Sequence, residues 1–313
     1  MEVPLNSTYL DPIDQLFYLN KEFYSKLNDF SAPIYVVGGQ AIAYWVKYYE
    51  TNLQPTAYDL RVAHSVDIDY MSKIADISIV ADCWNVPISF ATNHQPPSIA
   101  LIKLETPSKE IKKTNDGLLF LDVDEFNVDG KISGNIVDFI DRPAGFEVKY
   151  FESKKISSVY STNFNFPIDY NLTPNDNLKV LTPIGCLQSR LANIFRTQKS
   201  NKIEVERIKL LRQIILYYFQ DCGAELSFRH LKTHIDVLFN VIISDDGIKL
   251  YTQHDVDLRP VFYNLSNMNF LPDTFILNEY IHMKNKLDDK FERRKKAYLL
   301  YLNKNNVNTC DVK

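Results

Sequence analysis

The chain has 313 residues, which suits one large domain or two ordinary ones at roughly 100–200 residues per domain. Hydrophobic residues make up 45% and charged residues 24%, so a mainly disordered chain is excluded and a buried core is expected. No apolar run reaches the length of a membrane span, and the N-terminus lacks the pattern of a signal peptide. The four cysteines are far apart. The sequence therefore predicts a cytoplasmic protein with reduced cysteines and no membrane partner.

Charge is distributed unevenly along the chain. Residues 1–175 carry 14 basic and 23 acidic residues, whereas residues 176–313 carry 21 basic and 16 acidic residues. This asymmetry indicates two domains with different roles, although basic residues that simply decorate solvated helices would give the same count. The basic run at 290–296 has the same two interpretations, a solvated helix face or a patch for a phosphate backbone.

The first predicted element is an amphipathic helix over 11–30, where apolar residues recur at helical spacing. A short apolar strand over 34–37 follows and runs directly into Gly38 and Gly39. The next segment, 40–49, is rich in Ala and aromatic residues and predicts a helix. The two glycines are therefore expected at a strand-to-helix turn.

Alternating patterns predict several further strands before the texture changes near residue 178. These strands are expected over 65–71, 98–105, 118–126 and 134–141, with 147–153 as a further candidate and 77–84 as either helix or strand. Long helical patterns follow over 183–194, 204–219, 226–243 and 275–302. The sequence thus predicts an α+β fold, with a mixed sheet and flanking helices in 1–175 and an all-helical domain in 176–313.

The sharpest local motif is Asp67-Ile68-Asp69 within the predicted strand 65–71. Alternate side chains of a strand share a face, so Asp67 and Asp69 project together while Val66 and Ile68 face the core. Two carboxylates at this spacing are suitable ligands for Mg²⁺, which takes a few carboxylates and completes its shell with water and phosphates. A solvated strand face is the plain alternative.

The same pattern occurs again at Asp122-Val123-Asp124 and serves as an internal control. Only the first motif lies downstream of a strand, a Gly-Gly turn and a helix. Glycine lets backbone N–H groups approach a phosphate, and the helix N-terminus adds a partial positive charge. Gly38 and Gly39 are therefore candidate phosphate-binding residues, although they could merely permit a tight turn. His64 could also touch a phosphate, or it could simply be packed or solvated.

Together, IYVVGGQAIAYW and HSVDIDY resemble the nucleotidyltransferase superfamily, and most closely its AbiEii/AbiGii toxin-type branch. A third Asp on a later apolar strand belongs to that pattern, and Asp138 in NIVDFI matches it. A later segment of the family resembles LTPIGCLQSRLANI, in which Arg190 stands at a position that is usually Lys. The resemblance covers about residues 30–200. It implies a nucleotidyltransferase-like sheet domain in the N-terminal part of the chain.

The resemblance also implies a reaction and its residues. An NMP would move from an NTP to a hydroxyl acceptor, with two Mg²⁺ ions, or Mn²⁺ instead, on the triphosphate. Asp138 would deprotonate or orient the attacking hydroxyl. The implied catalytic and metal-binding residues are Asp67, Asp69 and Asp138, and the implied nucleotide-binding residues are Gly38, Gly39, Ser65 and Arg190.

The acceptor is left open by the sequence. RNA such as tRNA is one candidate, because the C-terminal half is basic and the branch includes toxins of that kind, which work beside a cognate antitoxin protein. A protein or small-molecule hydroxyl is another. An inactive nucleotidyltransferase-like module that binds a nucleotide or a protein partner is the alternative function. No P-loop, GxSxG or HExxH motif occurs, so other common enzyme classes are not indicated.

Arg190 also stands out from its helical pattern. Leu187, Leu191 and Ile194 form the apolar stripe of the predicted helix, and Arg190 borders that stripe. A guanidinium at a buried edge must satisfy its donors. A triphosphate could do so, or an ion pair with an acidic residue of the N-terminal domain.

Overall fold

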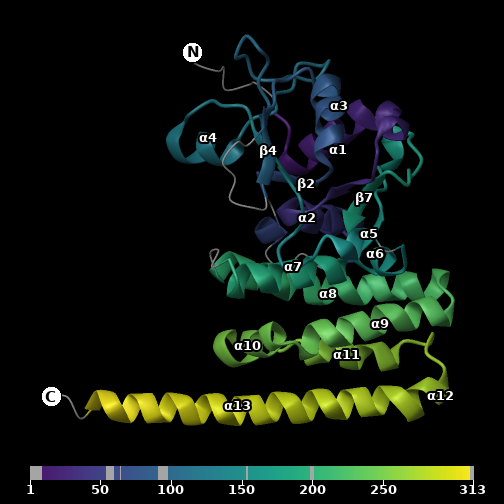
Figure 1. Cartoon of the computed structure of the whole chain (residues 1–313), viewed down its shortest axis with the longest axis vertical. Helices are drawn as coiled ribbons and strands as arrows, with labels where there is room; N and C mark the ends of the chain where they lie inside the picture. Colours follow the sequence, from purple (N-terminus) through teal and green to yellow (C-terminus); the bar gives the residue numbers. More distant parts are fainter. Residues whose placement is uncertain are drawn as a thin grey trace. The chain divides into compact units, whose positions relative to one another are not determined.

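The computed structural model describes residues 9–53, 60–63, 65–90, 98–152, 154–197 and 201–310. The chain divides into two compact units, Met1–Ser189 and Arg190–Lys313. The first contains a mixed sheet with flanking helices and the second is helical, so the predicted α+β fold is confirmed (Figure 1).

The sheet of the first unit has seven strands in the order β3-β4-β5-β2-β1-β7-β6. Their bounds are β1 Ile34–Val36, β2 Ile68–Met71, β3 Ser89–Phe90, β4 Ser98–Lys103, β5 Ile136–Ile140, β6 Ser161–Asn163 and β7 Leu178–Leu181. The pairs β2–β5 and β1–β7 are parallel, and the other neighbours are antiparallel. The centre of the sheet is therefore β5-β2-β1-β7, which brings together segments far apart in the sequence.

One face of this sheet is the core of the first unit. Helices α1 (Pro12–Phe23) and α3 (Ile74–Trp84) pack together and cover it (Figure 1). Tyr70 of β2 stacks on Phe139 of β5 and contacts Trp84 of α3. The Tyr70 hydroxyl donates a 2.6 Å hydrogen bond to Asn20 of α1. Because alternate strand residues point to opposite faces, the intervening residues of β2 and β5 project from the other side.

The first unit contains further helices besides α1 and α3. They are α2 Gly38–Tyr48, α4 Val123–Asp129, α5 Lys149–Glu152 and α6 Lys154–Tyr160, with α7 Pro183–Phe195 running across the division between the units. Short 3₁₀ segments occur at Tyr24–Asp29, Leu60–Ala63 and Ile168–Tyr170. The indole N–H of Trp45 in α2 donates to the backbone oxygen of Leu181 at 2.7 Å, which ties α2 to β7.

Several predicted boundaries need correction. The segment 118–126 is not a strand: Leu119 and Leu121 form only isolated bridges, and helix α4 begins immediately afterwards. The candidate strand over 147–153 contains helix α5, and the ambiguous segment 77–84 belongs to helix α3. The predicted division after residue 175 comes too early, because β7 pairs with β1 and thus belongs to the sheet.

The second unit consists of helices with roughly parallel axes (Figure 1). Its helices are α8 Asn201–Glu225, α9 Phe228–Ile243, α10 Asp245–His254, α11 Arg259–Asn264, α12 Asp273–Phe275 and α13 Ile281–Cys310, with a 3₁₀ turn at Leu265–Asn267 and a π-helical turn at Ile276–Tyr280. Buried apolar side chains such as Ile215, Leu238, Phe262 and Leu287 form its core.

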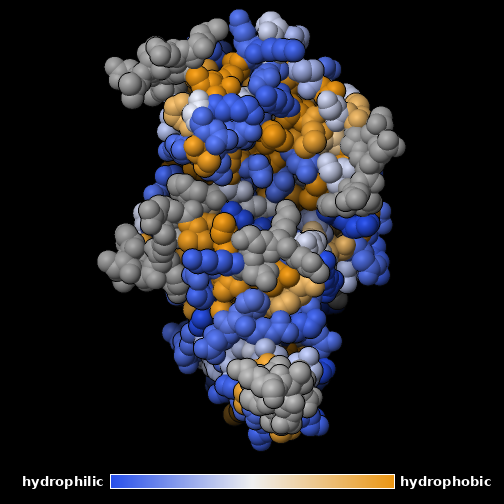
Figure 2. Space-filling model, turned by 90° about the vertical axis from the view of Figure 1, so that its left-hand side faces the viewer, coloured by the Kyte–Doolittle hydropathy of each residue, from blue (hydrophilic) through white to orange (hydrophobic). Residues whose placement is uncertain are grey.

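Figure 2 shows a face on which hydrophobic residues gather in several clusters among hydrophilic ones. On α13, Leu300 and Tyr301 are more than half exposed. Among the described residues, no helix combines the length and apolarity needed to cross a membrane.

Candidate active site

Strands β2 and β5 bring Asp69 and Asp138 side by side. The two residues are register partners in a parallel pair, so their Cα atoms lie about 5 Å apart. The residues that flank them, Ile68 and Tyr70 on β2 with Phe139 on β5, are fully buried on the core face. Both carboxylates therefore belong to the opposite face, where each is half-buried. Two carboxylates this close repel each other unless a cation or donors compensate them.

Asp67 lies on the same side of the chain as Asp69, one residue before β2 begins. It is exposed, in contrast to Asp69. The predicted pairing of Asp69 with Asp138 thus appears in the structure as a direct strand-to-strand contact, whereas Asp67 stands at the more open end of this group.

Gly38 is packed directly against the Asp69 carboxylate. A Cβ atom at position 38 would lie 1.8 Å from Asp69 Oδ2 and 2.6 Å from its Cγ. The backbone φ of Gly38 is +64°, a left-handed conformation that disfavours other residues. The Val37 amide also donates a 3.0 Å hydrogen bond to the backbone oxygen of Asp69. Glycine is therefore required at this turn for two independent reasons: the left-handed backbone conformation, and the close approach of Asp69, which is itself a candidate catalytic residue.

The N-terminus of α2 begins at this same turn. Its N-cap is Val37, an apolar residue that offers α2 no side-chain cap. Unpaired N–H groups and the helix dipole make such a terminus favourable for an anion, either the Asp69 carboxylate or a phosphate. Gly39 is buried in the first turn of α2. Its predicted role as a phosphate contact remains a prediction.

Ser98 is a site residue that the sequence analysis missed. Its hydroxyl donates a 2.6 Å hydrogen bond to Oδ1 of Asp138. Ser98 begins β4, which pairs antiparallel with β5. No local pattern around Ser98 indicates this contact, because the two residues are 40 positions apart and only strand pairing brings them together.

Buried amide side chains hold the segment that leads into β2. Asn135 is fully buried and donates from its amide to the backbone oxygen of Val66 at 2.9 Å and to Gln15 Oε1 at 2.8 Å. Gln40 of α2, also fully buried, donates to the backbone oxygen of Ser65. These bonds fix the direction in which Asp67 and Asp69 enter the sheet. They were not predicted, since a lone Asn or Gln carries no distinctive pattern.

Ser65, a predicted nucleotide-binding residue, is half-buried beside this segment. Its hydroxyl donates to the backbone oxygen of Asp67 at 3.3 Å, which stabilises the turn before β2. His64, the other candidate phosphate contact of this segment, lies outside the described residues. The role of Ser65 toward a phosphate therefore stays a prediction.

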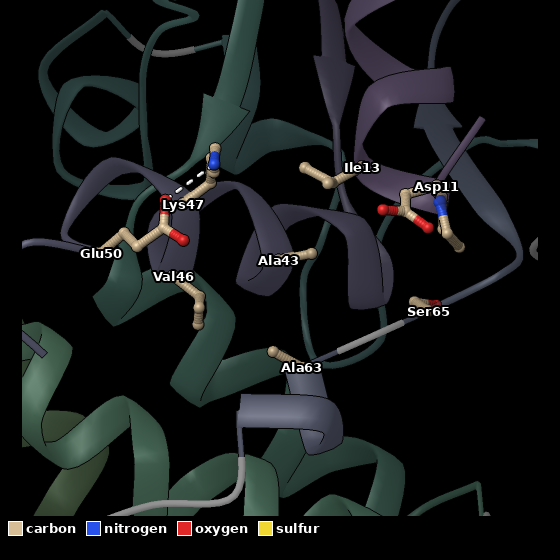
Figure 3. A pocket seen from close by; sticks show the side chains of 9 residues that line it. Asp11, Ile13, Ala43, Val46, Lys47, Glu50, Ala63 and Ser65 are labelled. Atoms are coloured by element: carbon tan, nitrogen blue, oxygen red, sulfur yellow. Dashed lines mark hydrogen bonds and ion pairs between the residues drawn. The ribbon is translucent and has the colours of Figure 1, made fainter. Parts of the chain in front are cut away.

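A pocket of about 220 Å³ opens beside α2 on the side of Ser65 (Figure 3). Its apolar wall comes from α1, α2 and the segment before β2, namely Ile13, Ala43 and Ala63. At its edge Lys47 and Glu50 form an ion pair of 2.7 Å. Both side chains of this pair are about half exposed, so it contributes little to stability.

The second Asp-hydrophobic-Asp motif has a different structure. Asp122 is the N-cap of α4, and its Oδ1 accepts hydrogen bonds from the amides of Asp124 and Glu125 at 3.1 and 3.0 Å. Asp124 points into solvent from the first turn of the helix. This motif is therefore a helix cap, and Asp138 rather than Asp122 or Asp124 lies beside Asp69.

Arg190 begins the helical unit and is 5% exposed. Its Nη1 lies 3.1 Å from Glu204 Oε2, and Arg207 approaches the same carboxylate at 3.0 Å. The expected ion pair therefore exists, but its partner is in the helical unit and not in the N-terminal domain. The expected contact of Arg190 with a nucleotide stays a prediction.

The donor set is suitable for Mg²⁺ in composition. Mg²⁺ commonly takes one or two protein carboxylates and obtains its other ligands from water and substrate phosphates, so Asp69 and Asp138 suffice as a first pair. Among the described residues, no group of three or more His, Cys, Asp or Glu side chains converges as a metal site. A site here thus depends on the ligands that a triphosphate supplies.

Comparison with known proteins gives no match to this chain. No family model matches the chain. Neither a curated protein nor a solved structure matches it.

Proposed function

We propose that this protein is a metal-dependent nucleotidyltransferase that moves an NMP from an NTP to a hydroxyl acceptor. One observation carries the proposal: Asp69 and Asp138 are register partners on β2 and β5, and the Asp69 carboxylate is packed against Gly38 at the start of α2. Paired carboxylates beside a glycine turn and a helix N-terminus are what a triphosphate with its cation requires.

The residues have separate roles in this reaction. Asp69 and Asp138 would hold Mg²⁺, or Mn²⁺, as the first pair of ligands, and Asp67 would join them from the open end of the group. The bound ion would neutralise charge on the triphosphate and lower the barrier to displacement. The amides of Gly38, Gly39 and the first turn of α2 receive the phosphate oxygens, and Ser65 borders that turn.

Asp138 receives the proton of the acceptor. The acceptor oxygen forms a bond to the α-phosphorus while the bond to pyrophosphate breaks, and the hydroxyl proton passes to Asp138. The hydrogen bond from Ser98 fixes the rotamer of Asp138 on the face that carries Asp69. Orientation of this carboxylate is the contribution that we assign to Ser98.

RNA, such as tRNA, is the acceptor class that we propose. The second unit has a basic surface on α13, where Arg293, Arg294 and Lys296 are exposed within one turn. Such residues contact a phosphate backbone without regard to base sequence. A cognate antitoxin protein is the corresponding protein partner.

The decisive experiment incubates the purified protein with each labelled NTP, Mg²⁺ and total RNA, or with lysate proteins. Label transferred to RNA supports the proposal, and the same reaction is run with Asp69→Asn and Asp138→Asn. Asp124→Asn is the matched control, because Asp124 belongs to the same sequence pattern but lies in solvent. Equal transfer by Asp69→Asn and wild type would contradict the metal-site assignment.

A second candidate function is an inactive module that binds a nucleotide or a protein partner. The burial of Arg190 against Glu204 favours it, since the basic residue expected to contact the nucleotide already has an acidic partner. Triphosphate binding without transfer to any acceptor would support this candidate.

A further inference from the structure

A second pocket lies on the carboxylate face of the sheet, beyond Asp69. It has a volume of about 210 Å³ and is formed by the ends of β1, β2 and β5 together with α5. An apolar cavity of about 150 Å³ can hold benzene, so a single aromatic ring fits this volume. The pocket belongs entirely to the first unit.

Aromatic and apolar side chains form the walls. Tyr35 of β1 and Phe151 of α5 meet edge to face with ring centroids 5.2 Å apart. Met71 of β2 is the register partner of Tyr35, so the two side chains lie on the same face. Val148 completes the apolar wall and is 43% exposed. This lining favours a flat ring, which would stack on or against the two aromatic residues.

The polar groups of the pocket favour a hydrogen-bond donor. Asp141 lines it, and Asp141 Oδ1 is buried without a hydrogen-bond partner in the described part of the chain. The other oxygen, Oδ2, lies 3.5 Å from Arg142 Nη1. A buried acceptor left unsatisfied is costly, so a ligand that donates an N–H to the Asp141 carboxylate gains by removing that cost.

Charge argues against a phosphate in this pocket. Asp141 and Glu152 contribute two carboxylates, and Lys73 contributes one ammonium group. Arg142 offsets the charge of Asp141 from outside the lining, so an anionic ligand would meet no net positive charge, whereas a neutral ring with N–H donors would find acceptors. The phosphates of a substrate are therefore expected at Gly38, at the other end of β2.

The pocket is also placed along β2 in line with the carboxylates. Met71 follows Asp69 by two residues on the same face, a separation of about 7 Å. Asp69 therefore lies between the Gly38 turn and the pocket. A nucleoside with its base in the pocket would direct its sugar toward Asp69 and Asp138. This placement of the sugar rests on the proposed function.

We infer that this pocket binds a flat heteroaromatic ring that carries an exocyclic amino group, the chemistry shared by adenine, cytosine and guanine. The ring packs against Tyr35 and Phe151, and its amino group donates to the Asp141 carboxylate. The base of the incoming nucleotide and a base of the acceptor are the two sources of such a ring.

The test measures nucleoside binding to the full-length protein by calorimetry, without divalent cation or triphosphate. Adenosine is paired with purine riboside and cytidine with uridine, because the second member of each pair lacks the amino group. The amino-bearing nucleosides should bind roughly tenfold more tightly or better, as expected for a hydrogen bond to a charged group. Asp141→Asn should remove most of this preference, and Asp129→Asn, at an exposed acidic residue of α4, should not change it.

Phe151→Leu separates ring contacts from folding, because it keeps an apolar side chain at the pocket wall. This variant should bind all four nucleosides more weakly, while its melting temperature changes little. Undetectable binding of every nucleoside, equal affinity within both pairs, or an unchanged preference in Asp141→Asn would overturn the inference.

Two further measurements keep this inference distinct from the proposed function. Asp69→Asn should abolish nucleotidyl transfer but retain the nucleoside preference. If the wild-type protein binds nucleosides with this preference but transfers no nucleotide, only the proposed function is contradicted. Adenosine binding is then repeated with saturating ATP. Exclusion identifies the ring as that of the nucleotide, and simultaneous binding identifies it as that of the acceptor.

Discussion

Two regions of the first unit contain the same three-residue pattern and use it differently. Around Asp69 the pattern lies at the start of a central strand, and the carboxylate meets Gly38 and lies next to Asp138. Around Asp122 the pattern begins helix α4, and the carboxylate caps backbone amides. The difference shows that two acidic residues in alternation carry chemical meaning only when neighbouring strands place other functional groups beside them.

The largest difference between the two regions should appear in activity. Asp69→Asn and Asp138→Asn are each expected to lower kcat by roughly 100-fold or more, because a metal ligand or a proton acceptor is lost. Asp124→Asn should leave kcat unchanged. Initial rates of label transfer, with melting temperatures to check folding, measure this contrast. Loss of activity in all three variants would mean that the second motif is also part of the site.

The next largest effect should come from glycines in the two regions. Gly38 and Gly130 have nearly equal backbone φ values of +64° and +65°. A Cβ at Gly38 would overlap Asp69, whereas a Cβ at Gly130 would meet nothing within 4 Å. Each Ala substitution costs about 1–2 kcal/mol of left-handed strain, and Gly38→Ala additionally costs the displacement of Asp69.

Urea unfolding of the two variants measures this difference. Gly38→Ala should be clearly less stable than Gly130→Ala, and Gly38→Ala should also lose triphosphate binding. The double variant Gly38→Ala with Asp69→Ala should recover part of the stability, because the two closest overlapping atoms are removed and only the Cβ of residue 69, at 2.9 Å, remains. Equal free energies of unfolding in the two single variants would show that the approach of Asp69 is not what requires Gly38.

The capping role of Asp122 predicts a smaller effect on stability. Asp122→Ala removes the acceptor for two amides of α4 and should lower the free energy of unfolding by about 0.5–2 kcal/mol. Nucleotidyl transfer should be unaffected. Asp122→Ser, which keeps a capping oxygen, is the control and should recover most of the loss in urea unfolding. A large loss of transfer in a folded Asp122→Ser variant would contradict a purely capping role.

The smallest expected effect concerns Glu125, which follows the second motif. Hydrogen bonds from Ser133 and Lys131 lower the pKa of Glu125 below its ordinary value of 4.5. A carboxyl with a lowered pKa in the folded state stabilises the protein above 4.5, and this contribution disappears as the pH falls through the folded pKa. Melting temperatures of wild type and Glu125→Gln should therefore begin to converge as the pH falls below 4.5 and should coincide below the folded pKa of Glu125. A difference that persists there would indicate an effect other than charge.

Part of the candidate site could be predicted from local patterns. The apolar segment before Gly38 and the alternation around Asp69 indicate a strand, a turn and a second strand, and the structure contains all three. The likeness of Asp138 to a family position led to the correct neighbour of Asp69. Ser98 and Asn135 could not be predicted, because strand pairing and buried hydrogen bonds between distant segments determine their contacts.

Periodicity also misled in two places for physical reasons. The segment around Asp122 alternates like a strand. The Asp122 side chain instead accepts hydrogen bonds from backbone amides and caps the start of helix α4. Strand β7 follows a Pro- and Asn-rich segment that resembles a linker, yet it pairs with β1 in the sheet. In both cases an interaction that the pattern does not contain outweighs the local preference.

The sequence by itself determined the α+β class, the acidic and basic halves, and the positions of the two acidic motifs. These features follow from local periodicity and composition, which are properties of contiguous residues. Only the tertiary structure decided that Asp69 meets Gly38 and Asp138, that Arg190 pairs with Glu204, and that Asp141 lines a pocket. Each of these contacts joins segments that the chain separates, so the packing of strands and helices selects it, and no local pattern encodes it.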